Sequence, residues 1–262
     1  MITGMTLTFY KYQGTGNDFV IMDNRNGHIH LSTAQIHHLC DRRFGIGADG
    51  LMLLNTLSGY DFEMKYYNAD GNESSMCGNG GRCLTKFAYD MGIHKTTYRF
   101  LASDGEHEAE LDEKNWIRLK MKDVDTITQH NGDAILDTGS PHYIKTVQDI
   151  MKLDVFNEGR SIRNSKDFAE KGINVNFVEQ ESKNIVVRTY ERGVEDETFS
   201  CGTGVTAAAL VFAHNDKGFN RVDIKTKGGK LAVEFDKIND QQFRNIWLCG
   251  PADFVFKGEI TI

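Results

Sequence analysis

The sequence predicts an α+β protein of two similar lobes, each with a curved, mostly antiparallel sheet around one main helix. The first observation behind this prediction is a repeated phrase, Cys-Gly-x-Gly, which begins at Cys77 and again at Cys201. The second is the apolar run, typical of a helix, that follows each copy. The third is that short alternating segments, typical of strands, occupy most of the remaining chain. One main helix and several strands in each half fit the α+β class.

Alternation of apolar and polar side chains marks the expected strands. They lie at residues 7–12, 62–66, 116–121, 185–190, 230–235 and 246–249. Helical signals are fewer. Ser32 is a suitable N-cap for a short helix, in which Ile36, Leu39 and Cys40 share one face.

Two further helices are expected directly after the repeated phrases. After Cys77, apolar residues recur at helical spacing as far as Met91, and Gly92 is a natural stop. After Cys201, residues 205–213 are apolar on nearly all sides. A helix of this kind is expected to be buried inside a sheet or barrel.

The two halves of the chain share one order of elements, which suggests a duplicated unit. A predicted strand ends shortly before each Cys-Gly phrase, and a polar turn, the phrase, a helix and further strands follow it. A change of composition at residues 129–133 predicts an N-terminal lobe over residues 1–130, carrying Cys77, and a C-terminal lobe over residues 131–262, carrying Cys201. A small-molecule site is expected in a cleft between such lobes.

The composition limits the classes of function. The 262 residues carry a net charge of −7, with 40% apolar and 26% charged residues, as in ordinary globular proteins. Nucleic acid and anionic membranes require basic patches, so neither is expected as a partner. No apolar stretch approaches the ~20 residues of a membrane span. The first residues lack the pattern of a signal peptide, so we expect a cytoplasmic protein.

The five cysteines fit neither a disulfide framework nor a metal site. Their number is odd, and their spacing contains no Cys-x-x-Cys pair and nothing like a zinc ribbon. No metal is therefore expected. Cys40 and Cys249 are expected to be small core residues, because free cysteine is among the most buried residue types.

The repeated phrases suggest proton chemistry at two thiols. A helix N-terminus lowers the pKa of a free thiol from its usual value of about 8.5, and its free amide groups bind anions such as carboxylate. The glycines of both phrases let those amides approach a ligand closely. Inversion of a carbon that bears hydrogen needs a base on one face and an acid on the other. Cys77 and Cys201 are candidates for this pair.

Longer motifs surround the two cysteines. They include Gly-Thr-Gly-Asn-Asp-Phe at 14–19, Asn-Ala-Asp-Gly-Asn-Glu at 68–73, Met-Cys-Gly-Asn-Gly-Gly-Arg-Cys at 76–83 and Tyr-Glu-Arg-Gly at 190–193. Together with residues 41–50, 174–179 and 200–204, they make the chain resemble the diaminopimelate epimerase family. The resemblance runs in order from about residue 7 to the C-terminus. It implies two pseudo-symmetric lobes, each a barrel-like sheet around a central helix.

The resemblance also implies an activity. Members of the family interconvert LL- and meso-diaminopimelate without a cofactor, on the route to lysine and peptidoglycan, and are often homodimers. By resemblance, Cys77 and Cys201 are the catalytic acid and base, and His142 and Glu191 tune their protonation. The substrate-binding positions implied are Asn17, Asn68, Gly78, Asn79, Asn176, Glu191, Arg192, Gly202 and Thr203. Arg192 is suited to fork onto a distal carboxylate.

The chain departs from the family pattern at two positions. Ser140 stands where many members have a substrate-contacting Asn, and Gly50 stands where some have a substrate-contacting Gln. Gly50 has no side chain, so that role is not carried over to it.

Two alternative functions remain open. A proline- or hydroxyproline-type racemase would share the architecture, but such enzymes commonly carry His where this chain has Asn79. A binding protein switched by a disulfide between Cys77 and Cys201 is the other alternative. A pyridoxal-phosphate enzyme is disfavoured because no phosphate-binding motif accompanies a lysine.

Overall fold

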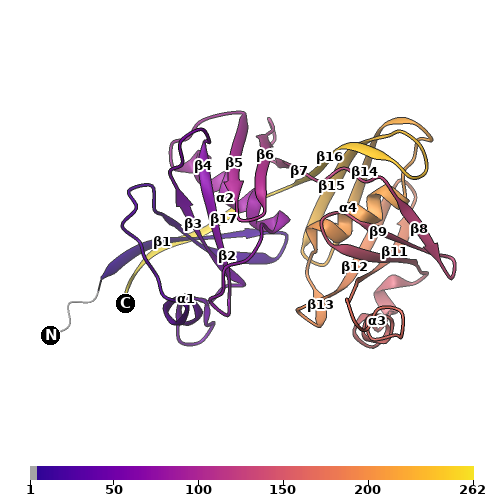
Figure 1. The fold of residues 1–262 in the computed structure, drawn as a ribbon, viewed down its shortest axis with the longest axis horizontal. Helices are drawn as coiled ribbons and strands as arrows, with labels where there is room; N and C mark the ends of the chain where they lie inside the picture. The colour runs from indigo at the N-terminus through magenta and orange to yellow at the C-terminus, as the bar shows by residue number, and fades with distance from the viewer. Residues whose placement is uncertain (1–4) are drawn as a thin grey trace. The chain divides into compact units, whose positions relative to one another are not determined.

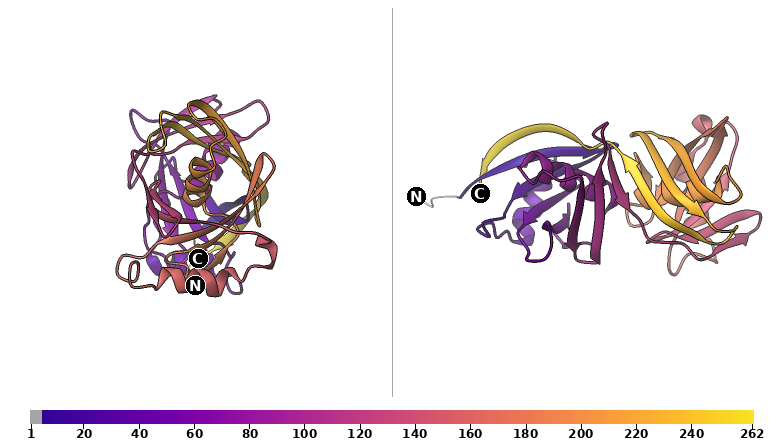
Figure 2. Two further views of the ribbon diagram at one scale, coloured as in Figure 1. Left: turned by 90° about the vertical axis from the view of Figure 1, so that its right-hand side faces the viewer. Right: turned by 90° about the horizontal axis from the view of Figure 1, so that it is seen from above.

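The computed structural model describes residues 5–262, and the chain forms two compact units. Unit 1 contains the chain up to Leu119 together with Pro251–Ile262, and unit 2 contains Lys120–Gly250. The sequence-based division after residue 130 differs from these bounds. One reason is that the last strand of the chain, β17, pairs with the first strand, β1, and so lies in unit 1. The two strands run side by side in Figure 1 and in the right-hand view of Figure 2.

The strands of unit 1 form one sheet in the order β17-β1-β2-β3-β4-β5-β6. Strand β7 follows β6 at the boundary. The pairs β2–β3 and β4–β5 are parallel, and the others are antiparallel. The bounds are β1 (Thr6–Gly14), β2 (Asn17–Asp23), β3 (Gly50–Asn55), β4 (Phe62–Asn68), β5 (Thr97–Ala102), β6 (Gly105–Leu111), β7 (Ile117–Lys120) and β17 (Asp253–Thr261).

Helix α2 (Gly78–Asp90) is the central element of unit 1. It packs against β1, β2, β3, β6 and β17, so strands surround most of it (Figure 1). Met91 is its C-cap, and Gly92 then adopts a positive φ of 93°, which glycine reaches without steric cost. Helix α1 (Thr33–Cys40) begins at a capping box of Ser32 and Gln35, and it buries Ile36, Leu39 and Cys40 as predicted.

The strands of unit 2 form a sheet in the order β8-β9-β10-β11-β12-β14-β15-β16, with β13 paired to part of β12. The pairs β10–β11 and β12–β14 are parallel. The bounds are β8 (Ile127–His130), β9 (Asp133–Asp137), β10 (Pro141–Thr146), β11 (Asn174–Glu181), β12 (Asn184–Glu191), β13 (Asp196–Thr198), β14 (Gly218–Thr226), β15 (Gly229–Lys237) and β16 (Phe243–Gly250).

Helix α4 (Gly202–Val211) is the central element of unit 2. It contacts strands along nearly the whole sheet, from β9 to β16. The left-hand view of Figure 2 shows it end-on within a ring of strands. Its residues from Gly204 to Leu210 are all buried, as predicted from their apolar character. Helix α3 (Val155–Arg163) and the short 3-10 turn η1 (Ile150–Lys152) lie between β10 and β11.

The two units repeat one topology. In each, an antiparallel pair leads to a parallel crossover carrying a short helix, α1 or α3. An antiparallel pair and a second parallel crossover carrying the central helix, α2 or α4, follow. The predicted α+β class is therefore confirmed. Within residues 5–262, no helix is long and apolar enough to cross a membrane.

Candidate active site

Cys77 is the N-cap residue of α2. Its backbone is extended, with φ −98° and ψ 134°, and its side chain makes no capping hydrogen bond. The Cys77 carbonyl accepts the first helical bond, from the amide of Gly81 at 2.7 Å. The thiol is partly exposed and stands beside the first amides of the helix, which lack partners within the helix. This geometry suits a thiol that acts on a bound anion.

Two asparagine side chains lie next to Cys77. The Cys77 Sγ donates to Asn17 Oδ1 at 3.6 Å, and Asn79 Nδ2 donates to the same oxygen at 3.4 Å. The Nδ2 group of Asn17 donates in turn to a carboxylate oxygen of Asp49. Three residues predicted to form the site, Cys77, Asn17 and Asn79, are thus in direct contact.

Behind Asn17 lies a group of four charged side chains. Arg42 donates to both Asp18 and Asp49, at 2.6 Å and 2.7 Å from Nη2, and Lys11 Nζ lies 2.8 Å from Asp18. Burial of Asp18 opposes its ionisation, but hydrogen bonds from Arg42 and Lys11 outweigh it and lower its pKa to about 2. The Asp18 carboxylate is therefore a fixed acceptor at neutral pH.

Asn68 and Gly50 face each other on neighbouring strands. Asn68 is the exposed last residue of β4, and its register partner on β3 is Gly50. A Cβ atom at position 50 would lie 2.5 Å from a ring carbon of Tyr66 and 2.6 Å from the Tyr67 carbonyl oxygen. The departure from Gln at this position is therefore matched by the Tyr66 ring, which fills the space of a larger side chain.

Cys201 occupies the corresponding position in unit 2. It is the N-cap of α4, with φ −114° and ψ 114° and no capping bond from its side chain. Only 7% of the residue is exposed, and its Sγ lies 3.5 Å from Thr203 Oγ1. Thr138 Oγ1 donates to the Thr203 carbonyl at 2.8 Å and fixes the first turn of the helix.

Asn176 is enclosed within unit 2. Its exposed fraction is 0%, its Nδ2 donates to the Tyr143 carbonyl at 3.2 Å, and its Oδ1 accepts from Thr189 Oγ1 at 2.9 Å. A Cβ atom at Gly204 would lie 2.3 Å from the same Oδ1. The polar atoms of Asn176 are thus engaged inside the unit, and its role as a direct substrate ligand stays a prediction from resemblance.

His142 is a buried, neutral imidazole. Its exposed fraction is 0%; burial first, and then the charge of Arg192, lower its pKa to about 3. Its Nδ1 lies 3.0 Å from Asn176 Nδ2, which can only donate, so the ring proton belongs on Nε2. That Nε2 has no hydrogen-bond partner in residues 5–262. A buried N–H donor without a partner is costly, so His142 stays a candidate site residue.

Both the backbone amide and the guanidinium of Arg192 form hydrogen bonds that fix its position. Asn174 Oδ1 accepts from the Arg192 amide at 2.8 Å, and Asn174 Nδ2 donates to Ser140 Oγ at 2.9 Å. Ser140 Oγ also accepts from Arg192 Nη2 at 3.3 Å. Ser140 therefore keeps a contact with the predicted site despite its shorter side chain. Glu191, the half-buried last residue of β12, precedes Arg192 directly.

Sequence reasoning missed Asn174 and Arg82. Asn174 is 3% exposed and organises Arg192 and Ser140, whereas Arg82 is 0% exposed and donates to Asn79. The available signal was position, because both lie inside motifs that carry the resemblance, Arg82 at 76–83 and Asn174 at 174–179, where Asn174 alternates with Asn176 on one strand.

The remaining cysteines are buried and chemically quiet. Burial raises the pKa of Cys40 to about 11 and raises that of Cys83 further. Cys249 is also buried, as predicted for it and for Cys40.

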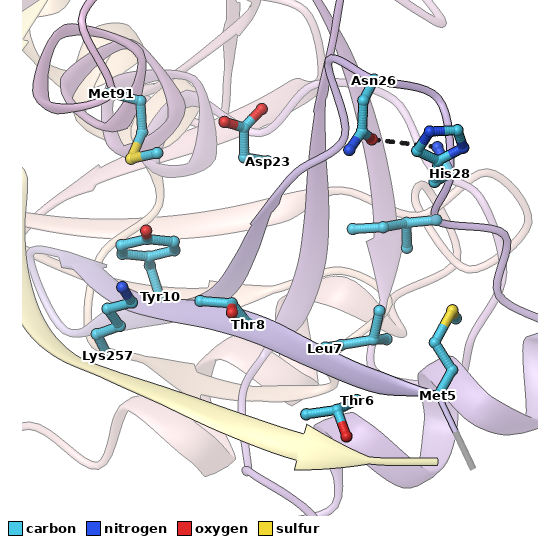
Figure 3. Close-up of a pocket in the computed structure, with 11 residues that line it drawn as sticks. Met5, Thr6, Leu7, Thr8, Tyr10, Asp23, Asn26, His28, Met91 and Lys257 are labelled. Atoms are coloured by element: carbon cyan, nitrogen blue, oxygen red, sulfur yellow. Dashed lines mark hydrogen bonds between the residues drawn. The ribbon is translucent and has the colours of Figure 1, made fainter. Parts of the chain in front are cut away.

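The structure has a separate pocket in unit 1, with a volume of about 400 Å³ (Figure 3). It is lined by β1, the neighbouring Lys257 of β17, Met91 and residues between Asp23 and Ile29. Its lining contains no residue predicted to belong to the site. Among residues 5–262, no group of three or more His, Cys, Asp or Glu side chains is arranged to hold a metal ion.

Comparison with known proteins agrees with the geometry. The family model described as Diaminopimelate epimerase matches residues 9–127 and 134–255. The chain belongs to the diaminopimelate epimerase family. The relative of that name from Flavobacterium psychrophilum is 50% identical over 257 residues, covering 97% of this chain and 100% of the relative. The one from Chlorobaculum tepidum is 44% identical over 259 residues, covering 95% and 99%.

Solved structures of lower identity share the fold of the diaminopimelate epimerase family. A Bacillus anthracis phenazine biosynthesis protein of the PhzF family has a TM-score of 0.75 at 15% identity, covering 98% of this chain and 100% of that chain. A hydroxyproline epimerase from Agrobacterium vitis, with bound trans-4-hydroxy-L-proline, has a TM-score of 0.67 at 12% identity, covering 98% and 93%. The predicted membership of this isomerase family is confirmed by these sequence matches.

Proposed function

We propose that the protein interconverts LL- and meso-diaminopimelate with Cys77 and Cys201 as its acid and base. The observation that supports this most strongly is that both cysteines cap their central helices without using their thiols for capping. A glycine follows each one, so a thiol and the first amides of a helix, which have no partner within the helix, occur together in both units. A single occurrence would be weak support, whereas the family membership makes the pair specific.

The proposed reaction moves one proton on and one proton off the same carbon. A thiolate removes the α-proton of the substrate and becomes a thiol, while the other thiol gives its proton to the opposite face and becomes a thiolate. The carbanion that forms between these events is stabilised by amides directed at its carboxylate. Removing one such preorganised donor costs about 3–4 kcal/mol in measured enzymes.

We assign the other predicted residues to binding and tuning. Arg192 and Glu191 bind the distal amino-acid group, and His142 and Glu191 tune the thiols. The amide of Asn176 also lies against His142 inside unit 2. The residues proposed to contact substrate are Asn17, Asn68, Gly78, Asn79, Asn176, Glu191, Arg192, Gly202 and Thr203.

The test is washout of the α-hydrogen from deuterated LL-diaminopimelate. The wild-type protein is expected to release deuterium to water and form the meso isomer, whereas Cys77→Ser and Cys201→Ser each lose about 10²–10⁴-fold in rate. Cys249→Ser, which replaces a buried thiol outside the site, serves as the control. Full epimerisation by either site variant would rule out the two-thiol mechanism.

A proline-type racemase is the second candidate. Its support is the shared fold with the hydroxyproline epimerase, and Asn79 in place of the common His argues against it. Exchange at the α-carbon of proline and 4-hydroxyproline is measured in the same assay, and turnover of these alone would favour it. A disulfide switch predicts instead that oxidation, not substrate, changes the state of Cys77 and Cys201.

We also propose a homodimer formed through β17. Phe254, Val255 and Phe256 on this strand are 44–52% exposed, and β17 pairs with β1 on one side. A second copy of the chain would cover these side chains. Sedimentation is expected to give a dimer for the wild type and a monomer for Val255→Glu; a wild-type monomer would contradict the proposal.

We propose that the enzyme works in the cytoplasm, supplying lysine and peptidoglycan precursors. None of the five cysteines, all within residues 5–262, forms a disulfide, which suits a compartment that keeps thiols reduced. Cell fractionation tests the location, and lysine and diaminopimelate auxotrophy on gene loss tests the pathway.

A further inference from the structure

We propose that Arg82 is a positioning residue for Cys77, acting through Asn79 and Asn17. This inference rests on the proposed function, because it concerns one of the two thiols that the epimerisation uses. Its basis is a directed series of hydrogen bonds that begins at a buried guanidinium, passes through two amides and ends at a carboxylate. The Cys77 thiol donates to the oxygen of the second amide.

The Arg82 guanidinium is buried in the first turns of α2. Its exposed fraction is 0%, and Nη2 donates to Asn79 Oδ1 at 3.1 Å and to Thr15 Oγ1 at 3.2 Å. Nη1 donates to the Gly78 carbonyl at 3.4 Å, and Nε donates to the Pro251 carbonyl at 3.4 Å. A guanidinium held by several acceptors in the interior has little freedom to turn.

At one end of the series, the Arg82 guanidinium fixes the orientation of the Asn79 amide. Since a guanidinium has no acceptor, only the Oδ1 of Asn79 can face Arg82. The Nδ2 of Asn79 must then point the other way, where it donates to Asn17 Oδ1. The contact with Arg82 therefore determines which way the Asn79 side-chain amide points.

At the other end of the series, the Asp49 carboxylate fixes the orientation of the Asn17 amide. The Asp49 carboxylate can only accept, so Asn17 turns its Nδ2 toward Asp49 and its Oδ1 toward Asn79 and Cys77. Arg42 holds Asp49 in place. The oxygen that faces the Cys77 thiol is thus set from both ends of the series.

The duplicated unit provides an internal comparison. Arg82 follows Cys77 by five residues, and Thr206 follows Cys201 by the same number. Both bond to the carbonyl of the glycine that follows the cysteine, Thr206 Oγ1 at 2.9 Å from the Gly202 oxygen. Only the guanidinium also reaches the side chain two residues after the cysteine. The bond to the glycine carbonyl occurs in both units, so we attribute it to the helix. The bond from Arg82 to Asn79 has no counterpart in unit 2, so we attribute it to the site around Cys77.

The first experiment is a double-mutant cycle on α-hydrogen washout from LL-diaminopimelate. Arg82→Met and Asn79→Ala are each expected to lower kcat/KM on the order of 10²-fold, because a small misplacement of a reacting group has effects of this size. The double variant is expected to lose little more than either single variant, since Arg82 acts through Asn79. Arg82→Lys, which keeps a donor, is expected to recover part of the loss.

Additive losses, or an Arg82→Met variant with wild-type kcat/KM, would overturn the proposal. If Arg82→Met does not fold, Arg82→Lys is compared with Arg82→Gln in the same cycle. Thr85→Val is the matched control, because it removes a buried hydroxyl from the same helix that, within residues 5–262, bonds only to the Gly81 carbonyl. Its kcat/KM is expected to stay at the wild-type value.

A second measurement separates this proposal from the proposed function. Alkylation by iodoacetamide, followed at each cysteine by mass spectrometry, needs no turnover. Arg82→Met is expected to change the rate at Cys77 and leave the rate at Cys201 unchanged. Equal rates in variant and wild type would overturn the role of Arg82, even if diaminopimelate were epimerised. A wild-type protein without activity would instead reject the proposed function.

Discussion

The two cysteines stand on equivalent helices, but different groups support them. Around Cys77 the supporting groups are amides anchored at both ends by charge, from Arg82 to Asp49 and Arg42. Around Cys201 they are neutral hydroxyls, with a neutral imidazole and a fully buried amide in the same unit. Duplication has therefore kept the helix, its capping cysteine and its glycines. The side chains that orient the polar groups have diverged.

This difference shows which parts of the repeat follow from backbone geometry. Both units need small residues after the cysteine, because other groups crowd the first helical turn. In unit 1 the nearest of these are flexible methionine side chains, whereas in unit 2 the nearest is the Asn176 amide. A larger side chain at the start of the central helix is thus expected to be tolerated better in unit 1 than in unit 2.

The largest expected effect concerns the departures from the family pattern, one in each unit. Gly50→Gln places a Cβ atom 2.5 Å from the Tyr66 ring and 2.6 Å from the Tyr67 carbonyl, so it is expected to lower the free energy of unfolding by about 3 kcal/mol. Ser140→Asn enters a partly exposed position and is expected to cost about 1 kcal/mol or less. Urea unfolding of both variants measures the difference.

Tyr66→Val added to Gly50→Gln removes the ring and is expected to recover part of the lost stability. Equal costs for Gly50→Gln and Ser140→Asn would remove the distinction between the two departures.

A medium effect is expected from the third residue after each cysteine. Gly204→Ala forces a Cβ atom to within 2.3 Å of Asn176 Oδ1 and is expected to destabilise the protein by about 2 kcal/mol. Gly80→Ala meets the Met52 sulfur at 3.3 Å, which can shift, and alanine favours the helix, so its net effect is expected to be close to zero. Thermal unfolding of the pair checks the order; a larger cost at Gly80 would reverse the comparison.

The smallest effect is expected from mild acid. The pKa of His142 falls from about 6.5 when unfolded to about 3 when folded, so the unfolded chain binds its proton first as pH falls. The stability contributed by neutral His142 is therefore present above pH ~6.5 and lost toward pH ~3; at pH 6 the loss is about 1 kcal/mol.

In unit 1 the low pKa of Asp18 contributes stability above about pH 4, which is lost as pH falls toward about 2. Hydrogen exchange, corrected for intrinsic rates, is expected to show α4 and β10 opening before α2 and β2. His142→Gln is expected to abolish this early opening in unit 2; simultaneous opening of both units would contradict the assignment.

The sequence was a good guide wherever local patterns carried the information. The apolar spacing after Cys77 and Cys201 predicted α2 and α4, and the capping residue Ser32 predicted α1. Helix α3 was missed because its apolar residues are few and only Val155 and Gly159 in it are buried, which leaves a weak signal. Strand β17 was missed because most of its residues are exposed, so it shows no clear alternation.

The motifs of the site were predictable from the sequence, but the hydrogen bonds that connect its residues were not. Cys77, Asn17 and Asn79 were named from the sequence, and they lie together. Arg82 and Asn174 lie inside the motifs but were given no role, because an Arg or Asn in a sequence is more often a surface or turn residue. Their importance comes from acceptors distant in the chain, such as Pro251 for Arg82 and Ser140 for Asn174.

The pairing of β17 with β1 has a consequence for the synthesis of the protein. Unit 2 is one continuous segment, Lys120–Gly250, whereas unit 1 is built from two segments that flank it in the chain. A ribosome therefore completes all of unit 2 before it reaches the strand that closes the sheet of unit 1 at β1. Until then β1 exposes an unpaired edge to the crowded cell, a position in which strands readily pair with other chains. The earlier-synthesised half is the last to be finished, so chaperone protection during translation matters most for unit 1.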